Sequence, residues 1–195
     1  MGRPRVHDEV TAVRLLDAAE EILESSALDT LSIRSLAAAT GTSTRAVYST
    51  FGSKRELLAA LAGRAFTLLE RDVDALPVTT DPASDLVAAG LAFRRLVTEH
   101  AALFRVAFHD SEPAEATWPE VRPLQQAALT RLRARIARVL PEDSTDAVLR
   151  THTVTFHALC EGLATLQLRG LPVQDTWEQS LRLLVRGMRG ERARP

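Results

Sequence analysis

Hydroxyl and cationic side chains follow one another closely between residues 42 and 54 of this 195-residue sequence. Arg45 carries a planar guanidinium, which forms paired hydrogen bonds with a phosphate or with the edge of a guanine base. Thr44 and Tyr48 carry hydroxyl groups that both donate and accept hydrogen bonds. From Thr30 through Arg55 there is no Asp or Glu, so one local surface can be positive although the whole chain has a formal net charge of -1. These residue types favour binding to a polyanion such as DNA.

Two short helices joined by a tight turn would position these side chains. Ser32 can accept hydrogen bonds from the free N–H groups of a helix start, and the apolar spacing after it predicts a helix over 33–40. Gly41 then suits a left-handed turn, and Thr42 or Ser43 can cap the next helix at once. Such a pair is typical of a helix-turn-helix, whose second helix enters the major groove.

The second helix would expose its polar side chains. Ala46, Val47 and Phe51 fall on its inward side, and the hydroxyl and cationic residues lie outward. Ser53 to Glu56 matches a capping box that starts a further helix and places Lys54 at its N-terminus, where phosphate is favoured. The predicted DNA contacts in this region are Arg34, Thr42, Ser43, Thr44, Arg45, Tyr48, Ser49, Thr50 and Lys54.

The first residues of the chain add a basic segment. Arg3 and Arg5 flank Pro4 within residues 1–7, and an extended arm of this composition can lay arginines in an adjacent minor groove. A terminus that contacts nothing can have the same composition, because short basic termini are common. The sequence leaves both alternatives open.

Residues 10–61 resemble the N-terminal domain of the TetR family of one-component transcriptional repressors. The resemblance is carried by the run LSIRSLA at 31–37 and by a second run at 48–58. That second run contains Tyr48, Thr50, Phe51, Gly52, Ser53 and Lys54, followed by Glu56, Leu57 and Leu58. Thr50 stands where many relatives have histidine. The resemblance implies a DNA-binding domain over 1–53 and a ligand-binding and dimerisation domain over 54–195.

The remaining sequence predicts an all-α fold, in which a three-helix head precedes a larger helical body. Strand signals are almost absent, and breaker residues separate the expected helices. The expected helices after the head cover 54–75, the segment from the break at 77–82 to residue 100, 101–109, 119–140, 145–169 and 176–189. The chain has one cysteine and lacks both a signal peptide and an apolar run of membrane-spanning length. We therefore expect a cytoplasmic protein with no membrane contact.

The last two predicted helices each carry one stripe of apolar or small residues at helical spacing. The stripes are Thr155, Leu159, Gly162 and Leu166 on the first helix, and Trp177, Leu181, Leu184 and Met188 on the second. Each stripe can face the chain's own core or a second copy of the chain. A glycine inside a helix costs about 1 kcal/mol relative to alanine, which a close helix crossing would justify for Gly162. The resemblance favours the second copy, because TetR relatives form a four-helix dimer interface from this pair, and a two-fold dimer implies a palindromic operator.

The resemblance also implies a small-molecule pocket in the middle of the chain. The candidate lining residues are mostly apolar with a few polar groups, as small-molecule sites generally are. They are Phe66, Phe93, His100, Phe104, Phe108, Trp118, Phe156 and Cys160. Each of them can equally be plain core, where aromatic side chains on apolar helix faces usually lie. The sequence does not name the effector.

His157, Cys160 and Glu161 fall on one face of a predicted helix and could ligate a metal. A structural zinc site normally needs four ligands and usually several cysteines, so a buried thiol beside a surface His–Glu pair is the favoured interpretation. No phosphate-binding glycine motif or carboxylate pair is present, and we predict no enzyme, metal or cofactor.

The prediction is therefore a homodimeric DNA-binding regulator, most simply a repressor that a small molecule releases from its operator. One alternative is a small-molecule-binding helical protein whose head has lost its DNA role. The other alternative is an activator without ligand-induced release.

Overall fold

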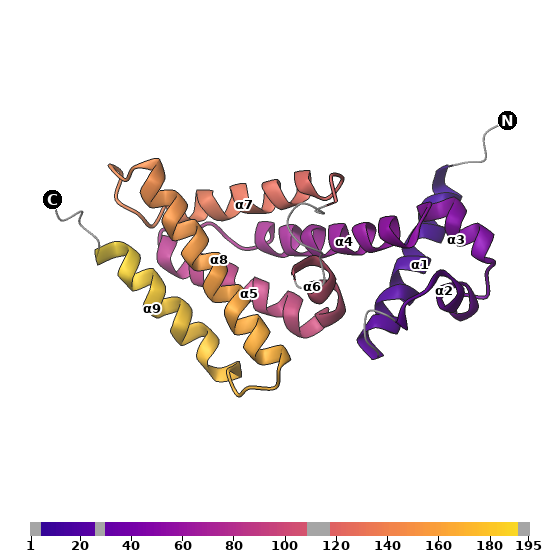
Figure 1. Ribbon diagram of the computed structural model, residues 1–195. Coiled ribbons are helices and arrows are strands. Elements are labelled where there is room, and N and C mark those ends of the chain that lie inside the picture. Colours follow the sequence, from indigo (N-terminus) through magenta and orange to yellow (C-terminus); the bar gives the residue numbers. More distant parts are fainter. Residues whose placement is uncertain (1–4, 26–29, 109–117, 191–195) are drawn as a thin grey trace. The chain divides into compact units, whose positions relative to one another are not determined.

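A computed structural model describes residues 5–25, 30–108 and 118–190. These residues form helices and no strand, which confirms the predicted all-α fold (Figure 1). The helices are α1 (Arg5–Ser25), α2 (Ile33–Ala39), α3 (Thr44–Phe51), α4 (Lys54–Asp74), α5 (Pro82–Glu99), α6 (Ala101–Phe108), α7 (Arg122–Ala137), α8 (Asp146–Leu168), the 3-10 helix η3 (Gln174–Thr176) and α9 (Trp177–Gly190). Within the described ranges no helix combines the length and the apolar character that crossing a membrane requires.

Two helix boundaries differ clearly from the predicted ones. Helix α1 begins at Arg5, so residues 5–7 are helical and do not belong to an extended arm. Helix α7 begins at Arg122, three residues after Pro119, and Pro123 occupies its first turn instead. A proline is tolerated there because the first N–H groups of a helix have no partner within that helix.

The chain divides into two compact units. The first unit contains residues 1–66 and 100–123, and the second contains residues 67–99 and 124–195. Helix α4 therefore passes from the first unit into the second without a break, and α6 belongs to the same unit as α1, α2 and α3. The functional boundary predicted after residue 53 stays a prediction.

The first unit is built on one face of α1. Helices α2 and α3 pack on each other and on α1, and α6 also packs on α1. Leu15, Ala19 and Leu23 recur every four residues along α1 and are buried, as are Leu36 of α2 and Val47 of α3. Burying a leucine or valine side chain stabilises a fold by about 1.5–3 kcal/mol. This small core therefore holds α3 in a defined position against α1 and α2.

The second unit is centred on α5, which packs against α8 and α9, and these two helices also pack on each other (Figure 1). Gly90 lies where α5 and α9 cross, because a Cβ at this position would lie 2.6 Å from Cδ2 of Leu181. The indole Nε1 of Trp177 donates a hydrogen bond of 2.8 Å to Oε1 of Gln167 and so ties the start of α9 to the end of α8.

Arginines of α7 hold the C-terminal turns of α4. The guanidinium of Arg131 forms ion pairs with Glu70 and with Asp74, the latter at 3.0 Å. One turn later, Arg135 donates a hydrogen bond of 2.8 Å to the carbonyl oxygen of Val73. Carbonyls in the last turn of a helix have no partner within that helix, so a cationic donor is well placed there.

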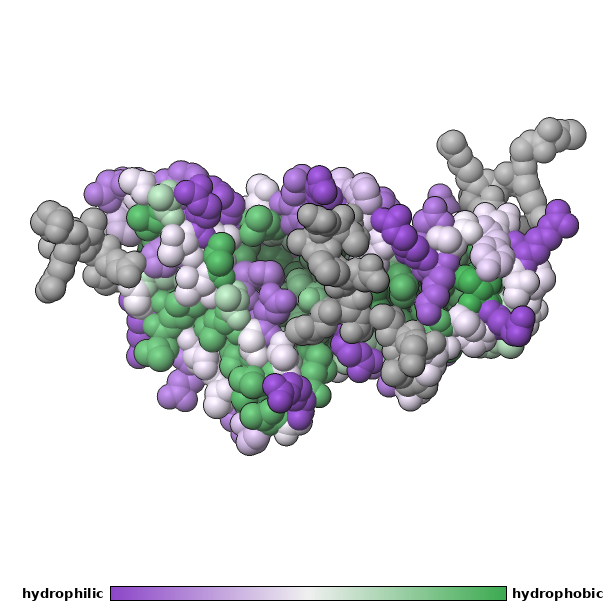
Figure 2. Space-filling view, in the orientation of Figure 1, coloured by the Kyte–Doolittle hydropathy of each residue, from purple (hydrophilic) through white to green (hydrophobic). Residues whose placement is uncertain are grey.

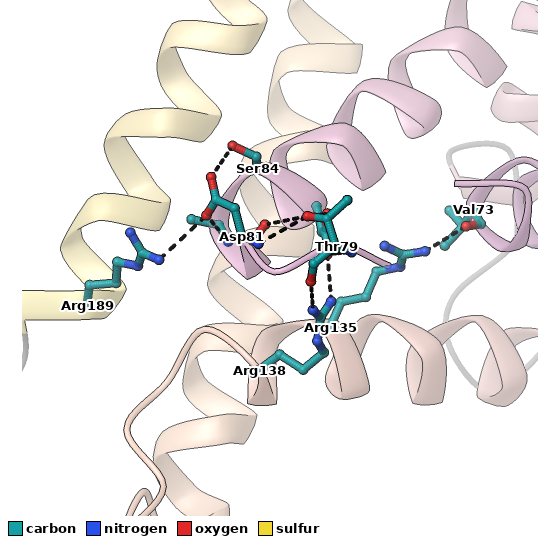
Figure 3. Close-up of polar contacts among 9 residues, drawn as sticks. Val73, Thr79, Asp81, Ser84, Arg135, Arg138 and Arg189 are labelled. Carbon is teal, nitrogen blue, oxygen red and sulfur yellow. Dashed lines mark hydrogen bonds and ion pairs between the residues drawn. The ribbon is translucent and has the colours of Figure 1, made fainter. Parts of the chain in front are cut away.

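The linker between α4 and α5 is held by Arg138, the residue that follows α7, and by Arg189 of α9 (Figure 3). Arg138 donates to Oδ2 of Asp85 at 2.7 Å and to the carbonyl oxygen of Thr79 at 2.6 Å. The N–H and the hydroxyl of Thr79 donate to the same carboxylate at 2.9 and 2.7 Å. These donors, Arg138 first, lower the pKa of Asp85 to about 2. Arg189 of α9 adds an ion pair with Asp81 at 3.6 Å.

Candidate nucleic-acid interface

The turn between α2 and α3 is fixed by local hydrogen bonds. Ser32 and Ser35 form a reciprocal capping box at the start of α2, in which each hydroxyl oxygen accepts from the other residue's N–H at 2.9 Å. Gly41 has φ of 64°, and Thr42 N–H then donates to the carbonyl oxygen of Ala37 at 2.9 Å. A glycine meets this left-handed conformation without a steric penalty, and α3 therefore starts almost directly after α2.

Helix α3 presents a polar face to solvent. Its hydroxyl cap is Ser43, whose Oγ accepts from the N–H of Ala46 at 3.1 Å. Thr44, Arg45, Tyr48 and Ser49 are exposed, and Tyr48 keeps 51% of its surface accessible despite its aromatic ring. On the opposite side Val47 is fully buried. The inward and outward sides of α3 are therefore those that the sequence predicts.

The neighbouring predicted contacts lie partly within the fold. Arg34 of α2 is exposed, whereas Thr42 and Thr50 are half-buried. The hydroxyl of Thr50 donates to the carbonyl oxygen of Ala46 at 3.0 Å, which leaves its oxygen free only as an acceptor. Arg3 lies outside the described residues, and so does the side chain of Arg5.

The start of α4 adds cationic residues beside α3 in sequence. Ser53 Oγ accepts from the N–H of Glu56 at 3.2 Å, which is one half of the predicted capping box. Lys54 is half-buried in the first turn, and Arg55 is exposed. An anion is stabilised at such a helix start by both the free N–H groups and the helix dipole.

Sequence reasoning missed one residue that holds this head. Arg14 of α1 donates a hydrogen bond of 2.8 Å from Nη2 to the carbonyl oxygen of Thr40, the residue that ends α2. The bond joins α1 to the helix-turn-helix directly before the turn. No local pattern could have found it, because the two residues are separated by 26 positions.

The candidate ligand residues divide between the two compact units. In the first unit, Phe66, Phe104 and Trp118 are buried and Phe108 is half-buried. The ring centroids of Phe66 and Phe104 lie 5.3 and 5.0 Å from that of Phe108, so three of the predicted aromatic residues form one cluster. His100 belongs to the same unit and contacts Glu20.

The second unit holds Phe93, Phe156 and Cys160, which are all buried. Burial raises the pKa of the Cys160 thiol to about 12. His157 stands half-exposed on the same helix, with its Nδ1 at 3.9 Å from the carboxylate of Glu161. Among the described residues, no three histidine, cysteine or acidic side chains lie together in a way that could hold a metal ion. A ligand role for the eight predicted residues stays a prediction.

The two predicted dimer stripes lie in different surroundings. On α9, Trp177, Leu181 and Met188 are at most 1% exposed and pack in the chain's own core, which was the other alternative that the sequence left open. The prediction that these three face a partner is corrected accordingly. Leu184 is half-buried.

The stripe on α8 is more accessible. Thr155 and Gly162 are exposed, and Leu159 and Leu166 are half-buried. A Cβ added to Gly162 would meet no heavy atom within 4 Å, so no crossing within this chain requires the glycine.

An exposed polar face on the second helix of a helix-turn-helix, within an all-helical chain, defines a DNA-binding transcriptional regulator. Residues 15–61 match the model of the family described as bacterial regulatory proteins, tetR family. This match confirms the predicted resemblance of the N-terminal segment to the TetR family.

Solved structures share the fold over most of the chain. A TetR-family transcriptional regulator from Streptomyces coelicolor is 23% identical with a TM-score of 0.71, over 96% of this chain and 80% of that one. The TetR family regulator PfmR from Thermus thermophilus is 21% identical with a TM-score of 0.71, over 89% and 97%. A TetR variant from Acinetobacter baumannii AYE in complex with minocycline is 21% identical with a TM-score of 0.64, over 89% and 93%. The search of curated proteins gave no match.

Proposed function

We propose that this regulator is a homodimeric repressor that binds a palindromic operator and leaves it when a small molecule binds. The observation that carries the proposal is the polar face of α3, where Thr44, Arg45, Tyr48 and Ser49 are exposed together. Repression and release by a ligand are the finer parts of the proposal. They are supported by the family resemblance.

In the proposed complex, α3 lies in the major groove. Arg45 and Thr44 contact base edges or phosphates, and Tyr48 packs beside the sugar-phosphate backbone or reaches a phosphate with its hydroxyl. Ser49 and Lys54 contact the backbone, where Lys54 benefits from the start of α4. Because there is no Asp or Glu from Thr30 through Arg55, no carboxylate of this segment repels the DNA phosphates.

The proposed dimer uses the exposed surfaces of α8 and α9. Hydrophobic side chains gather over these two helices on the face shown in Figure 2. Val154 of α8 and Leu183 of α9 are 62% and 72% exposed. Leu168 at the end of α8 and Leu171 in the segment after it are exposed as well. Exposed apolar side chains gathered on one face favour a protein partner, and the open space at Gly162 would let a second helix approach closely. A second copy of the chain is the partner that the TetR resemblance supplies.

A two-fold dimer would present two α3 helices to successive major grooves about 34–36 Å apart, so each operator half would repeat in inverted order. An effector bound in the body would change the separation of the two heads through α4, which runs unbroken between the units. The minocycline complex of a TetR variant supports a small molecule as the effector class.

Selection from random DNA duplexes tests the proposal. We expect the recovered sequences to share an inverted repeat and to bind with an affinity that falls steeply between two salt concentrations, because phosphate contacts release counterions. An unrelated duplex of equal length is the control. Recovery of no shared sequence, with equal affinity for the control, would support the alternative in which the head has lost its DNA role. Compounds that raise the melting temperature and release the selected duplex would then identify effectors.

A further inference from the structure

Helix α6 and the residue before it are joined to α1 by polar contacts. Nδ1 of His100 lies 2.6 Å from Oε1 of Glu20, and the N–H of Ala102 donates to Oε1 of Glu24 at 2.7 Å. Arg105 donates to the carbonyl oxygen of Leu23 at 2.6 Å, at the end of the same helix. All of these residues belong to the first compact unit. Helix α6 is thus attached to the helix that supports the DNA-binding head.

Glu20 is the centre of this arrangement. Its second carboxylate oxygen lies 3.6 Å from Nε of Arg64 in α4, and Nη1 of Arg64 lies 2.5 Å from Asp17, one turn earlier in α1. The Glu20 side chain is only 12% exposed. A charge-assisted hydrogen bond is strong where little water reaches it. A carboxylate that loses its partner at such a site lowers the stability of the fold. We call Glu20, His100 and Arg64 the Glu20 cluster.

The position of this cluster along the chain sets it apart from ordinary ion pairs. The chain crosses between the two units after residues 66, 99 and 123. His100 is the first residue after one crossing, and Arg64 lies within α4 two residues before the last residue of the first segment. Glu20 of α1 therefore contacts a residue beside two of the three positions at which the chain passes between the units.

Helix α1 continues the connection toward the DNA-reading residues. Arg14 of α1 bonds to Thr40 at the end of α2, and α1 also packs on α3. A displacement of α5 or α4 at the crossings would be carried by the Glu20 cluster to α1, and from α1 to the helix-turn-helix. Packed helices transmit such displacements because they are stiff compared with loops.

We propose that the Glu20 cluster couples the second unit to the DNA-binding head, with Glu20 and His100 as positioning residues that act through α1 and do not contact DNA. This inference rests on the proposed function. By reciprocity, if a change in the second unit alters DNA affinity, then DNA binding to the head must alter the second unit.

The test is amide hydrogen exchange of the full chain with and without the tightest duplex recovered by selection. In the unaltered protein the duplex should slow exchange in α3, in α6 and in α5 of the second unit, by roughly fivefold or more in α5, the lower end of usual site-to-site coupling. In His100→Leu the slowing should persist in α3 and be largely lost in α5. His100→Asn, which keeps a donor near the position of Nδ1, should restore it. Glu20→Gln should weaken the effect, and Glu21→Gln, at the exposed next position, should leave it unchanged.

Equal slowing of α5 in His100→Leu and the unaltered protein would overturn the proposed coupling. Absence of any slowing in α5 of the unaltered protein, with α3 protected, would overturn it as well. Failure of every selected duplex to bind would instead refute the proposed function, and the coupling with it. Normal melting of each variant without DNA separates a coupling defect from loss of the fold.

Discussion

Replacing Gly162 with alanine should have opposite effects in a lone chain and in the proposed dimer. It should stabilise a lone chain, and it should weaken the association of two copies. In a helix interior, glycine to alanine stabilises by about 0.5–1 kcal/mol, because glycine loses more backbone entropy on folding. A Cβ at residue 162 meets no heavy atom of its own chain within 4 Å, so nothing within the chain opposes this gain. In a close helix crossing between two copies, an inserted methyl group costs about 1–3 kcal/mol, and a two-fold dimer contains two of them.

The dimer account therefore predicts that Gly162→Ala weakens association by at least about tenfold, since 1.4 kcal/mol corresponds to one factor of ten. Analytical ultracentrifugation over a dilution series measures the dissociation constant, and thermal melting at two protein concentrations measures stability. Gly90→Ala is the contrasting variant, because its added Cβ would lie 2.6 Å from a buried leucine of the same chain and should destabilise at every concentration. A higher melting temperature for Gly162→Ala, with association unchanged, would refute the placement of Gly162 in an interface.

Three further predictions concern stability and reactivity. Ser32→Ala should lower the free energy of unfolding by about 1 kcal/mol, because it removes the cap of α2, and urea denaturation measures this loss; an unchanged midpoint would contradict the capping role. Asp85 has a folded-state pKa of about 2, below its ordinary 3.8, so its contribution to stability is complete above pH 3.8 and is lost as the pH falls through 2. Melting temperatures from pH 5 to 2 should therefore fall less steeply for Asp85→Asn than for the unaltered protein, and parallel curves would count against the Arg138 contact. Cys160 should react with a thiol reagent at pH 8 only after denaturation, because burial raises its pKa to about 12; rapid labelling of the folded protein would show that the thiol is accessible.

The head could be predicted from sequence because its structure is set by residues close together in the chain. The Ser32 cap, the Gly41 turn and the Ser43 cap each involve partners within five residues. The helical period then decides which side of α3 carries Val47 and which carries Arg45. Local capping and periodicity were sufficient for these features.

The dimer stripe on α9 shows where periodicity is insufficient. Trp177, Leu181 and Met188 have the spacing of one apolar face, but that spacing is the same for a face toward the chain's own core and for a face toward a partner. The distinction depends on which helix covers the stripe, and here α5 packs against α9. The exposed Leu183 was missed because it lies off that stripe.

Long-range polar contacts could not be predicted either. Glu20 and His100 are 80 positions apart, and the sequence contains many other carboxylates and cationic side chains that could pair with each of them. Only the packing of α6 on α1 selects this pair. Asp85 and Arg138 are 53 positions apart, and their contact likewise depends on the tertiary fold and not on a local pattern.

The role of α3 in reading DNA can be tested with two arginine substitutions that change the net charge equally. Fluorescence anisotropy would measure the affinity of the selected duplex for Arg45→Ala on α3 and for Arg95→Ala, an exposed arginine of α5 in the second unit. We predict that Arg45→Ala loses about 1–3 kcal/mol of binding free energy, with a smaller preference over an unrelated duplex. The dimer should stay intact, and Arg95→Ala should bind normally. Equal affinities for Arg45→Ala and the unaltered protein, or equal losses in both variants, would contradict this prediction.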